Sequence, residues 1–423
     1  MKILIIGSGG REHSIGLRLK QQGSDELYFA PGNAGTASIG TNVPISDSDT
    51  SSLLQFAQKE SIDLTVVGPE APLVLGIVDQ FEDAGLKIVG PNKIAAQLEG
   101  SKQWAKDLMI RYDIPTASYE VFTEYSSALD YVQNVDSFPI VIKADGLAAG
   151  KGVTIAADVA MAEQALKDCL CDHKFKDAGQ KVVIESFLEG EEASIFAFTD
   201  GETFLPMLPA QDHKAALDGD KGPNTGGMGA YCPAPLVTSD IYEKVNERVF
   251  SRLLQAFKSE GVEYKGIIYA GLMIDSDGDP YVVEFNARFG DPETQVVLPL
   301  LQTSLCDIFM DIAEGSLSSR RLEWSDESTV CVVLASGGYP GAYEKDKTLG
   351  GLDSCDDNES VHIVHAGTKQ SGDHIVTSGG RVLGVLASSS SLKEAIDHAY
   401  DAIDHITFEN KYFRRDIGFK ALR

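Results

Sequence analysis

Four short apolar segments alternate with helical segments over the first hundred residues, and each apolar segment ends at a glycine or proline turn. The apolar segments are 2–7, 26–32, 63–70 and 87–92, and the helical segments are 11–22, 50–60 and 73–84. This alternation predicts a doubly wound parallel sheet with a ligand crevice at the carboxyl ends of its strands. The expected fold of this part of the chain is therefore α/β.

The order of segments changes after residue 100, which indicates further domains. A helical segment over 97–112 leads to strands, a helix and a glycine-rich loop over 117–191, a pattern that predicts a compact α+β lobe. Strand-rich segments and two helices follow, near 240–259 and 294–314, and the final segments are typical of a small α+β unit. We expect a multidomain α/β and α+β chain divided at 1–101, 102–326 and 327–423, with a lobe inserted at about 123–191.

Charge and cysteine usage exclude several classes of partner. The 423 residues include 63 acidic and 36 basic side chains, and the net charge of −27 argues against nucleic acid or an anionic membrane as partner. No apolar run reaches membrane-spanning length, and the opening apolar segment runs into a glycine turn, so we interpret it as a strand rather than a targeting signal. Six cysteines without a C-x-x-C pair fit a reduced, cytoplasmic chain without a zinc or redox site.

The segment Val282-Val283-Glu284-Phe285-Asn286-Ala287-Arg288 ends an apolar strand with polar side chains at alternate positions. Alternation points Glu284 and Asn286 to the same side of the strand. A carboxylate and an amide oxygen suit Mg²⁺ or Mn²⁺ bound with phosphate oxygens, and Arg288 would add a guanidinium beside them. A strand ending in a solvated polar loop is the usual interpretation of an isolated pattern of this kind, and the other segments argue against it here.

Two glycine-rich segments predict phosphate contacts. The turn 7–13 lies where a dinucleotide fingerprint would, but Glu12 stands at the third glycine position and no acidic residue ends the second strand. Its backbone N–H groups favour phosphate or substrate binding over NAD or a purely structural turn. Lys143 precedes a loop of small residues over 144–153 that can close on phosphates as a mobile lid, with a plain glycine hairpin as the alternative.

Other polar segments could complete a site. The strand 182–188 runs into an acidic turn that could bind an adenine edge and a ribose, although a solvated acidic loop is the simpler interpretation. The blocks 211–214 and 222–231 form a long polar, glycine-rich stretch, and such stretches inside compact domains tend to be functional. His362 and His365 face opposite sides of a predicted strand, so we interpret them as structural.

The ordered motifs GSGGREH, PGNAG, GPEAPL, GSK, KADGLAAGKGV, QDHK, GPNTGGMGAY, EFNARFGDPE, HAGTK and RRDIG resemble the phosphoribosylamine–glycine ligase family over the whole chain. The resemblance implies an ATP-grasp fold with a Rossmann-like N-terminal domain, a core with an inserted mobile lobe and a small C-terminal α+β domain. It implies a monomer that joins glycine to 5-phosphoribosylamine in purine biosynthesis, while ATP becomes ADP and phosphate through a glycyl phosphate. The implied cofactors are ATP and Mg²⁺ or Mn²⁺.

The resemblance also assigns site residues by motif position. The implied metal ligands are Glu284 and Asn286. The implied catalytic residues are Arg288, Lys143 and Asp212. The implied ATP-binding residues are Lys102, Lys143, Gly146, Gly150, Lys151, Gly152, Glu185, Leu188 and Glu192. The implied contacts of phosphoribosylamine and glycine are Gly9, Gly10, Arg11, Glu12, Asn33, Glu70, Asn224, Thr225, Gly226 and Gly227.

Two departures from the family pattern bear on this site. An arginine commonly follows Q-D-H-K in the family, and Ala215 stands there, so a substrate contact from that position is absent or comes from another residue. ATP-grasp enzymes often carry another acidic metal ligand one strand before the E-x-N pair, and the corresponding segment 270–273 has no acidic residue.

Two other functions could use the same nucleotide machinery. A carboxylase-type ATP-grasp enzyme of purine synthesis is one, but the block 222–231 fits the glycine ligase better. A nucleotide sensor without turnover is the other, and the presence of Glu284, Asn286, Arg288 and Lys143 speaks against it.

Overall fold

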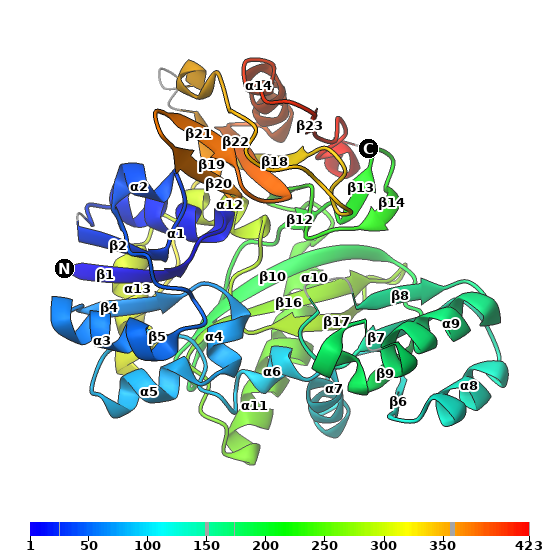
Figure 1. Ribbon diagram of the computed structural model, residues 1–423. Coiled ribbons are helices and arrows are strands. Elements are labelled where there is room, and N and C mark those ends of the chain that lie inside the picture. The colour runs from blue at the N-terminus through cyan, green and yellow to red at the C-terminus, as the bar shows by residue number, and fades with distance from the viewer. Residues whose placement is uncertain (25, 149–151, 173, 356–359, 423) are drawn as a thin grey trace.

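The computed structural model describes residues 1–24, 26–148, 152–172, 174–355 and 360–422. Gly150 and Lys151, two of the predicted ATP-binding residues, lie outside the described residues. The N-terminal sheet, a central sheet, a smaller lobe and a C-terminal sheet surround the middle of the molecule (Figure 1).

The first hundred residues form a five-stranded parallel sheet in the order β3-β2-β1-β4-β5, which confirms the predicted doubly wound arrangement. Its strands are β1 (Lys2–Gly7), β2 (Glu26–Pro31), β3 (Thr41–Asn42), β4 (Leu64–Val67) and β5 (Ile88–Val89). Its helices are α1 (Gly10–Gln21), α2 (Thr36–Ile39), α3 (Thr50–Glu60), α4 (Glu70–Val74) and α5 (Ile77–Asp83).

Two predicted helices are interrupted. The helix expected over 73–84 is divided between α4 and α5, because Gly76 between them adopts a left-handed φ of +84°. The helix expected over 97–112 is divided into α6 (Gln97–Gly100) and α7 (Lys102–Arg111). Ser101 is extended at this break, and its hydroxyl accepts the backbone N–H of Trp104 at 3.2 Å, which caps α7.

The smaller lobe, here called the lid, is an antiparallel sheet in the order β6-β9-β7-β8 with its own apolar core. Its strands are β6 (Tyr119–Phe122), β7 (Ile140–Ala144), β8 (Val153–Ala156) and β9 (Val182–Ser186). Its helices are α8 (Tyr125–Gln133), α9 (Val159–Leu166), a π-helical turn η1 (Lys167–Cys171) and a short helix η2 (Lys176–Gln180).

The central sheet is antiparallel in the order β11-β10-β16-β17. Its strands are β10 (Glu191–Thr199), β11 (Phe204–Pro206), β16 (Gly266–Ile274) and β17 (Pro280–Asn286). The helices beside it are α10 (Ser239–Val245), η3 (Asn246–Phe250), α11 (Ser251–Glu260), α12 (Glu293–Val297), η4 (Leu298–Leu300), α13 (Leu305–Glu314) and η5 (Leu317–Ser319). The single helix expected over 294–314 is broken near Pro299, which has no N–H to donate, and α13 restarts at the cap Ser304.

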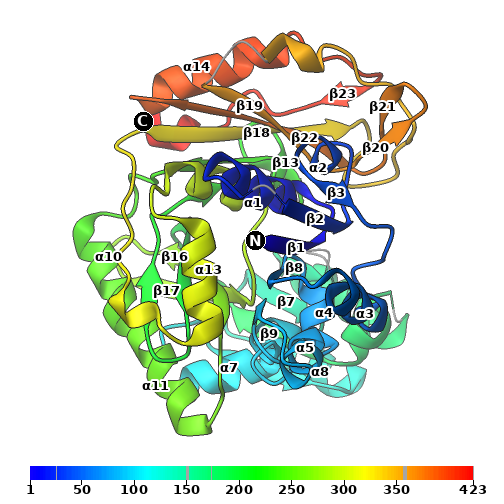
Figure 2. The same cartoon turned by 90° about the vertical axis from the view of Figure 1, so that its left-hand side faces the viewer.

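The C-terminal sheet takes strands from two distant parts of the chain. Strands β12 and β15, which precede residue 326, pair onward through β18 to β22 and β19, and β23 pairs with β18. The strands are β12 (Gln211–Asp212), β15 (Gly229–Cys232), β18 (Ser328–Ser336), β19 (Val361–His365), β22 (Arg381–Ser389) and β23 (Lys411–Tyr412). Helix α14 (Leu392–Ile403) lies along this sheet (Figure 2). Two hairpins and two short helices complete this part: β13 (Ala215–Leu217) with β14 (Lys221–Asn224), β20 (Thr368–Ser371) with β21 (His374–Thr377), η6 (Leu352–Cys355) and η7 (Phe419–Leu422).

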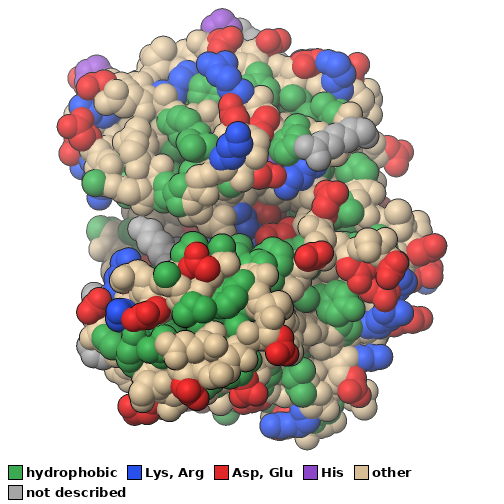
Figure 3. Space-filling view, turned by 90° about the vertical axis from the view of Figure 1, so that its right-hand side faces the viewer, with side chains coloured by type: hydrophobic (Ala, Val, Ile, Leu, Met, Phe, Trp, Pro, Cys, Tyr) green, Lys and Arg blue, Asp and Glu red, His purple; other side chains and the backbone are tan. Residues whose placement is uncertain are grey.

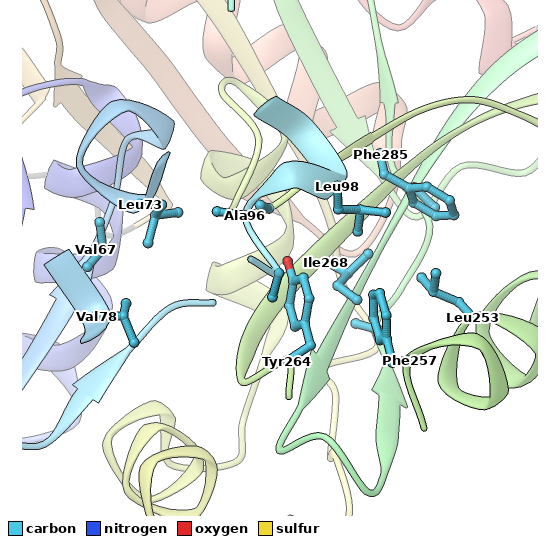
Figure 4. Packing of buried hydrophobic residues seen from close by; sticks show 14 of the residues in the cluster. Val67, Leu73, Val78, Ala96, Leu98, Leu253, Phe257, Tyr264, Ile268 and Phe285 are labelled. Atoms are coloured by element: carbon cyan, nitrogen blue, oxygen red, sulfur yellow. The ribbon is translucent and has the colours of Figure 1, made fainter. Parts of the chain in front are cut away.

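One apolar core joins the N-terminal sheet to the central sheet. Buried side chains of this cluster run from Val67 and Leu73, through Leu98 on α6, to Ile268 and Phe285 on the central sheet (Figure 4). Each such side chain contributes roughly 1.5–3 kcal/mol on burial, so the core fixes α6 against β17. Within the described residues, no helix is long and apolar enough to cross a membrane.

Candidate active site

A cavity of about 410 Å³ lies between the N-terminal sheet, the lid, the central sheet and the start of β22. Basic and acidic side chains are visible in the hollow that crosses the molecule between its upper and lower parts (Figure 3). Seven basic and seven acidic residues are among the described residues that line the cavity. In a chain of net charge −27, a lining whose acidic and basic side chains balance is less negative than the chain as a whole, which favours an anionic ligand there over the rest of the surface.

Many of the predicted site residues meet at this cavity. The predicted residues that line it are Arg11, Glu70, Lys102, Lys143, Gly152, Glu185, Asp212, Thr225, Gly226, Glu284, Asn286 and Arg288. The other described candidates are not among its lining residues: Gly9, Gly10, Glu12, Asn33, Gly146, Leu188, Glu192, Asn224 and Gly227. Polar lining residues that the sequence did not single out for a role are Glu99, Lys106, Lys214, Tyr269, Asp291, Glu293 and Arg381.

Strand β17 presents Glu284 and Asn286 to the cavity, as its alternation predicts. The residues paired with them on β16 are Gly271 and Tyr269, so the neighbouring strand offers no acidic side chain at these positions. The absence of a third acidic ligand from segment 270–273 thus agrees with the register. Among the described residues, no group of three or more His, Cys, Asp or Glu side chains has the arrangement of a metal site.

The Glu284 carboxylate is held in its charged form without an ion pair of its own in the described part of the chain. Burial opposes its ionisation, but Lys214, Lys143, Lys102 and Arg288 together hold its pKa below the usual range. Each of these four cations has another hydrogen-bond partner. A charged carboxylate left open in this way is suited to a cation that enters with the ligand.

The side chains of Asn286 and Arg288 converge on one buried carboxylate, that of Glu99. The Asn286 amide nitrogen donates to Glu99 Oε1 at 3.1 Å, and Arg288 Nη2 donates to the same oxygen at 2.6 Å. Arg288 Nε also donates to Glu70 at 3.2 Å. Burial raises the pKa of Glu99 to about 7 despite the opposing charge of Arg288. Glu99 directly precedes the GSK motif, and that position is the only sequence signal that pointed toward it.

Lys143 and Glu185 lie on neighbouring lid strands and form a buried ion pair with Lys106 of α7. The two Glu185 oxygens lie 2.9 Å from the ammonium groups of Lys143 and Lys106. Lys143 also donates to the Val283 carbonyl of β17 at 3.1 Å, which links the lid to the central sheet. Burial lowers the pKa of Lys106 to about 8, although Glu185 opposes the shift.

Lys102 and the start of the glycine-rich loop meet at the same end of the cavity. The Lys102 ammonium donates to the Gly146 carbonyl at 3.1 Å. Gly146 is not among the lining residues itself, but it holds a lysine that is. Burial lowers the pKa of Lys102, while Glu284 acts in the opposite direction. The break before α7 therefore places the Lys102 ammonium between the start of the glycine-rich loop and β17.

Asp212 belongs to a second cluster of charges with Lys214 and Glu293. Burial raises the pKa of Asp212 to about 7, Lys214 opposes this shift, and Glu293 adds to it. The pKa of Lys214 lies well above its usual value because Glu192 and Asp212 outweigh the effect of burial. Glu192 is not among the lining residues, but it accepts a hydrogen bond from the ammonium of Lys214, which does line the cavity. Although Ala215 stands where the family commonly has an arginine, Asp212 and Lys214 both line the cavity.

The glycine turn before α1 is occupied by protein carboxylates. The Gly9 N–H donates to Glu12 at 2.6 Å, and the Arg11 N–H points at Asp291 at 3.4 Å. Glu12 is also bound by Arg11 at 2.6 Å and is nearly fully buried. Asn33 connects loops, since its amide donates to the carbonyls of Ser8 and His365 and accepts two N–H groups of its own turn. In this turn Arg11 reaches the cavity, and its neighbours hold the turn in shape.

The C-terminal sheet contributes Arg381 to the cavity wall. Its guanidinium donates to the Gly226 carbonyl at 2.6 Å and to the Asp291 carbonyl at 2.7 Å, so it ties the 224–227 loop to the turn after β17. Gly227 in that loop has a left-handed φ of +110°, and a Cβ there would meet Pro292 at 2.4 Å. By contrast, His365 is buried, its ring nitrogen Nδ1 is hydrogen-bonded to the Thr368 hydroxyl, and its backbone N–H donates to His13 Nδ1, as expected of a structural histidine.

Comparison with known families matches all three parts of the chain to phosphoribosylglycinamide synthetase. The N domain, ATP-grasp (A) domain and C domain models of that family match residues 1–99, 100–294 and 329–420. The phosphoribosylamine–glycine ligases of Chlorobaculum tepidum and Allochromatium vinosum are each 50% identical over the whole chain, and the alignments cover 100% and 99% of those proteins.

Solved structures agree with this assignment. A crystal structure of the phosphoribosylamine–glycine ligase from Thermotoga maritima has a TM-score of 0.87 and 36% identity, over 99% of this chain and 100% of that one. The biotin carboxylase domain of a Hydrogenobacter thermophilus 2-oxoglutarate carboxylase has a TM-score of 0.74 over 97% of this chain and 91% of that one. At 14% identity, it shows the shared ATP-grasp fold alone. The chain therefore belongs to the phosphoribosylamine–glycine ligase family of ATP-grasp enzymes.

Proposed function

We propose that this chain joins glycine to 5-phosphoribosylamine in the cavity, with conversion of ATP to ADP and phosphate, as a step of purine biosynthesis. The observation that carries the proposal is that Glu284 lines the same cavity as Lys102, Lys143, Lys214 and Arg288, whose charges also lower the pKa of its carboxylate. Reaction between two anions, a carboxylate and a triphosphate, needs charge neutralisation and alignment more than a strong base. The family's relatives carry the name of this reaction.

Glu284 and Asn286 would hold Mg²⁺ or Mn²⁺. The donor set fits, because Glu284 is ionised and the Asn286 amide nitrogen is engaged by Glu99, which leaves the amide oxygen as the ligand atom. When bound, the ion would supply positive charge that offsets the negative charge of the ATP phosphates. A related-fold carboxylase domain has been solved with MgADP, which supports this class of cofactor.

ATP would lie between the lid and the central sheet. Lys102, Lys143 and Gly152 line the cavity there and would contact phosphates, and the predicted Gly150 and Lys151 belong to the same loop. Glu185 and Leu188 would take the adenine edge, and Glu192 the ribose. Glu185 would also orient the ammonium groups of Lys106 and Lys143, because it forms an ion pair with each of them.

The glycine carboxylate would attack the γ-phosphorus of ATP, releasing ADP and forming glycyl phosphate. The phosphoribosylamine nitrogen would then attack the glycyl carbonyl carbon, lose a proton and expel phosphate. Arg288 would stabilise the charge of the transferring phosphoryl group, and Asp212 with Thr225 and Gly226 would hold glycine. The 224–227 loop includes the other two predicted glycine contacts, Asn224 and Gly227.

Phosphoribosylamine would approach from the N-terminal sheet. Arg11 and Glu70 line the cavity on that side and would contact it directly. Gly9, Gly10, Glu12 and Asn33 would act by holding the turn that carries Arg11.

We further propose a monomeric, cytoplasmic enzyme with functional units at 1–101, 102–326 and 327–423 and a lid at about 123–191 that closes on ATP. The last unit contributes Arg381 to the cavity.

Glycine labelled with heavy oxygen in its carboxylate tests the proposed intermediate. The glycyl phosphate route transfers one labelled oxygen from glycine to inorganic phosphate, because the carbon–oxygen bond breaks when the amine attacks. Unlabelled phosphate in a reaction that still forms glycinamide ribonucleotide would contradict this route. ATP turnover that incorporates bicarbonate instead of glycine would point to the carboxylase-type alternative.

A further inference from the structure

We infer that Glu99 is a positioning residue whose carboxylate orients Asn286 and Arg288 for metal and phosphate binding. The inference rests on the proposed roles of Glu284 and Asn286 as metal ligands. It assigns a function to a residue that sits on a different element from the metal ligands, before the helix α7.

Three consecutive residues of the metal-facing segment bind this one carboxylate. Glu99 Oε1 accepts from the Asn286 amide at 3.1 Å and from Arg288 Nη2 at 2.6 Å, and Glu99 Oε2 accepts the Ala287 backbone N–H at 2.7 Å. The Glu99 side chain is only 6% exposed, so these donors replace water as its partners. Hydrogen bonds that involve a charged group are stronger than those between neutral groups, so these contacts favour one orientation of each side chain.

The orientation of an asparagine amide decides whether it attracts or repels a cation. With its nitrogen donating to Glu99, Asn286 turns its carbonyl oxygen to the other side of the amide, where a metal ion can use it. Without that acceptor, the amide can rotate and present its NH₂ group to the metal. Arg288 is fixed in a similar way, because Glu99 and Glu70 hold two different nitrogens of its guanidinium.

Glu99 is itself held by the fold on both sides. Its neighbour Leu98 and the Asn286 neighbour Phe285 lie next to each other in the apolar core (Figure 4). Beyond the helix break, the Gln103 N–H donates to Asp145 at 2.7 Å, close to the glycine-rich loop of the lid. Segment 99–103 therefore contacts the metal-facing strand at one end and the base of the lid loop at the other.

A purely structural role for Glu99 predicts a different result from a positioning role. If Glu99 only stabilised the fold, its loss would lower the melting temperature without changing how much Mg²⁺ improves nucleotide binding. If it orients Asn286, its loss should lower the metal-dependent part of ADP binding. ADP lacks the γ-phosphate that Arg288 would contact, so metal-free binding should change little. The ratio of ADP affinities with and without Mg²⁺, measured by titration calorimetry on the full chain, separates the two.

Glu99→Gln should reduce the Mg²⁺-dependent gain in ADP affinity about tenfold to a hundredfold, the usual effect of losing an outer partner of a metal ligand. The affinity for metal-free ADP should change less than about twofold. Glu99→Asp, which keeps the charge but shortens the side chain, should give an intermediate loss and serves if the glutamine variant folds poorly. Glu314→Gln, which removes a surface carboxylate paired with Lys87 at 2.7 Å, is the matched control and should keep the full gain.

A double variant tests whether Glu99 acts through Asn286. Asn286→Ala should itself reduce the gain, and adding Glu99→Gln should then have little further effect. A full Mg²⁺-dependent gain in Glu99→Gln, together with its loss in Glu284→Ala, would overturn the role of Glu99 and leave the metal site intact. A full gain in Glu284→Ala would instead overturn the proposed metal site, and the role of Glu99 with it.

Discussion

The Lys143 ammonium lies 2.9 Å from the Glu185 carboxylate, across the antiparallel pairing of β7 with β9. The two residues are diagonal neighbours, since Lys143 pairs with Val183 and Glu185 pairs with Val141 in the register. Because Lys143 also donates to the Val283 carbonyl of β17, this ion pair lies where the lid meets the central sheet. ATP phosphates that enter the cavity would meet a lysine already placed by the lid.

Replacement of Lys143 by methionine should therefore damage the phosphate site. We expect kcat/KM for ATP to fall by at least about a hundredfold, because a charge-assisted contact to a transferring phosphoryl group is lost. Steady-state kinetics with ATP varied and the other substrates saturating measure this. Lys167→Gln, which removes an exposed lid lysine paired with Glu163, should keep its activity within about twofold, and an equal loss in both variants would count against a specific role of Lys143.

The stability of the wild type should fall relative to Asp212→Asn as the pH rises. The pKa of Asp212 is raised by burial from 3.8 to about 7, so between these values the folded state holds a proton that the unfolded state has lost. Folding is favoured by that proton at low pH, and the advantage disappears as the pH rises through about 7. Thermal melting of both proteins from pH 4 to pH 8 should show a growing advantage of the asparagine variant, and a pH-independent difference would contradict this.

Arg414 should be essential for the stability of the C-terminal part. Its side chain is fully buried, lies 2.9 Å from Asp220 and 2.8 Å from Asp416, and donates to the Ala215 carbonyl at 3.1 Å. Arg414→Ala should lower the free energy of unfolding by about 3–5 kcal/mol, because it strips partners from two carboxylates and leaves a cavity.

Chemical denaturation of Arg414→Ala and of the neighbouring Arg415→Ala measures this cost. Arg415 is exposed and lies 5.1 Å from the ring of Phe413, so its loss should cost less than about 1 kcal/mol. Similar losses in the two variants would show that burial of Arg414 does not determine its contribution.

Nucleotide should slow hydrogen exchange at the base of the lid loop. The Ala144 N–H donates to the Gly152 carbonyl at 2.8 Å, and Lys102 donates to the Gly146 carbonyl, so ATP phosphates bound here would add partners to the described residues at the base of the loop. Exchange of the peptide around residues 144–153 with ATP and Mg²⁺ should be slower than without them. Unchanged exchange under saturating ATP would contradict lid closure on the phosphates.

Local sequence pattern was sufficient for the longer strands and for the side of β17 on which Glu284 and Asn286 lie. Alternation in β17 correctly placed Glu284 and Asn286 on the cavity side, because the side-chain period of a strand does not depend on its partners. The doubly wound N-terminal sheet was also predicted from local pattern, because each apolar segment ends at a glycine or proline turn and alternates with a helical segment. Helix lengths were less predictable, because the breaks at Gly76 and Ser101 depend on single backbone conformations.

The residues that sequence reasoning missed are those whose partners lie far away along the chain. Glu99 contacts Asn286 and Arg288, which are 187 and 189 positions away. Arg381 donates to the carbonyls of Gly226 and Asp291, which are also distant in the sequence. In the GSGGREH turn, the Gly9 N–H donates to the Glu12 carboxylate and the Arg11 N–H points at Asp291, which are contacts that the resemblance to a phosphate loop did not indicate. Only the fold shows which polar groups are already satisfied by protein partners.

The most direct test of the central claim is ADP release by the purified chain with ATP and Mg²⁺, with glycine or phosphoribosylamine omitted in turn. We predict that ADP accumulates over repeated turnovers only when both are present, because the glycyl phosphate formed with the first ADP has to react with the amine before the site can turn over again. ADP release that needs neither substrate, or that needs bicarbonate in place of glycine, would contradict the proposed reaction.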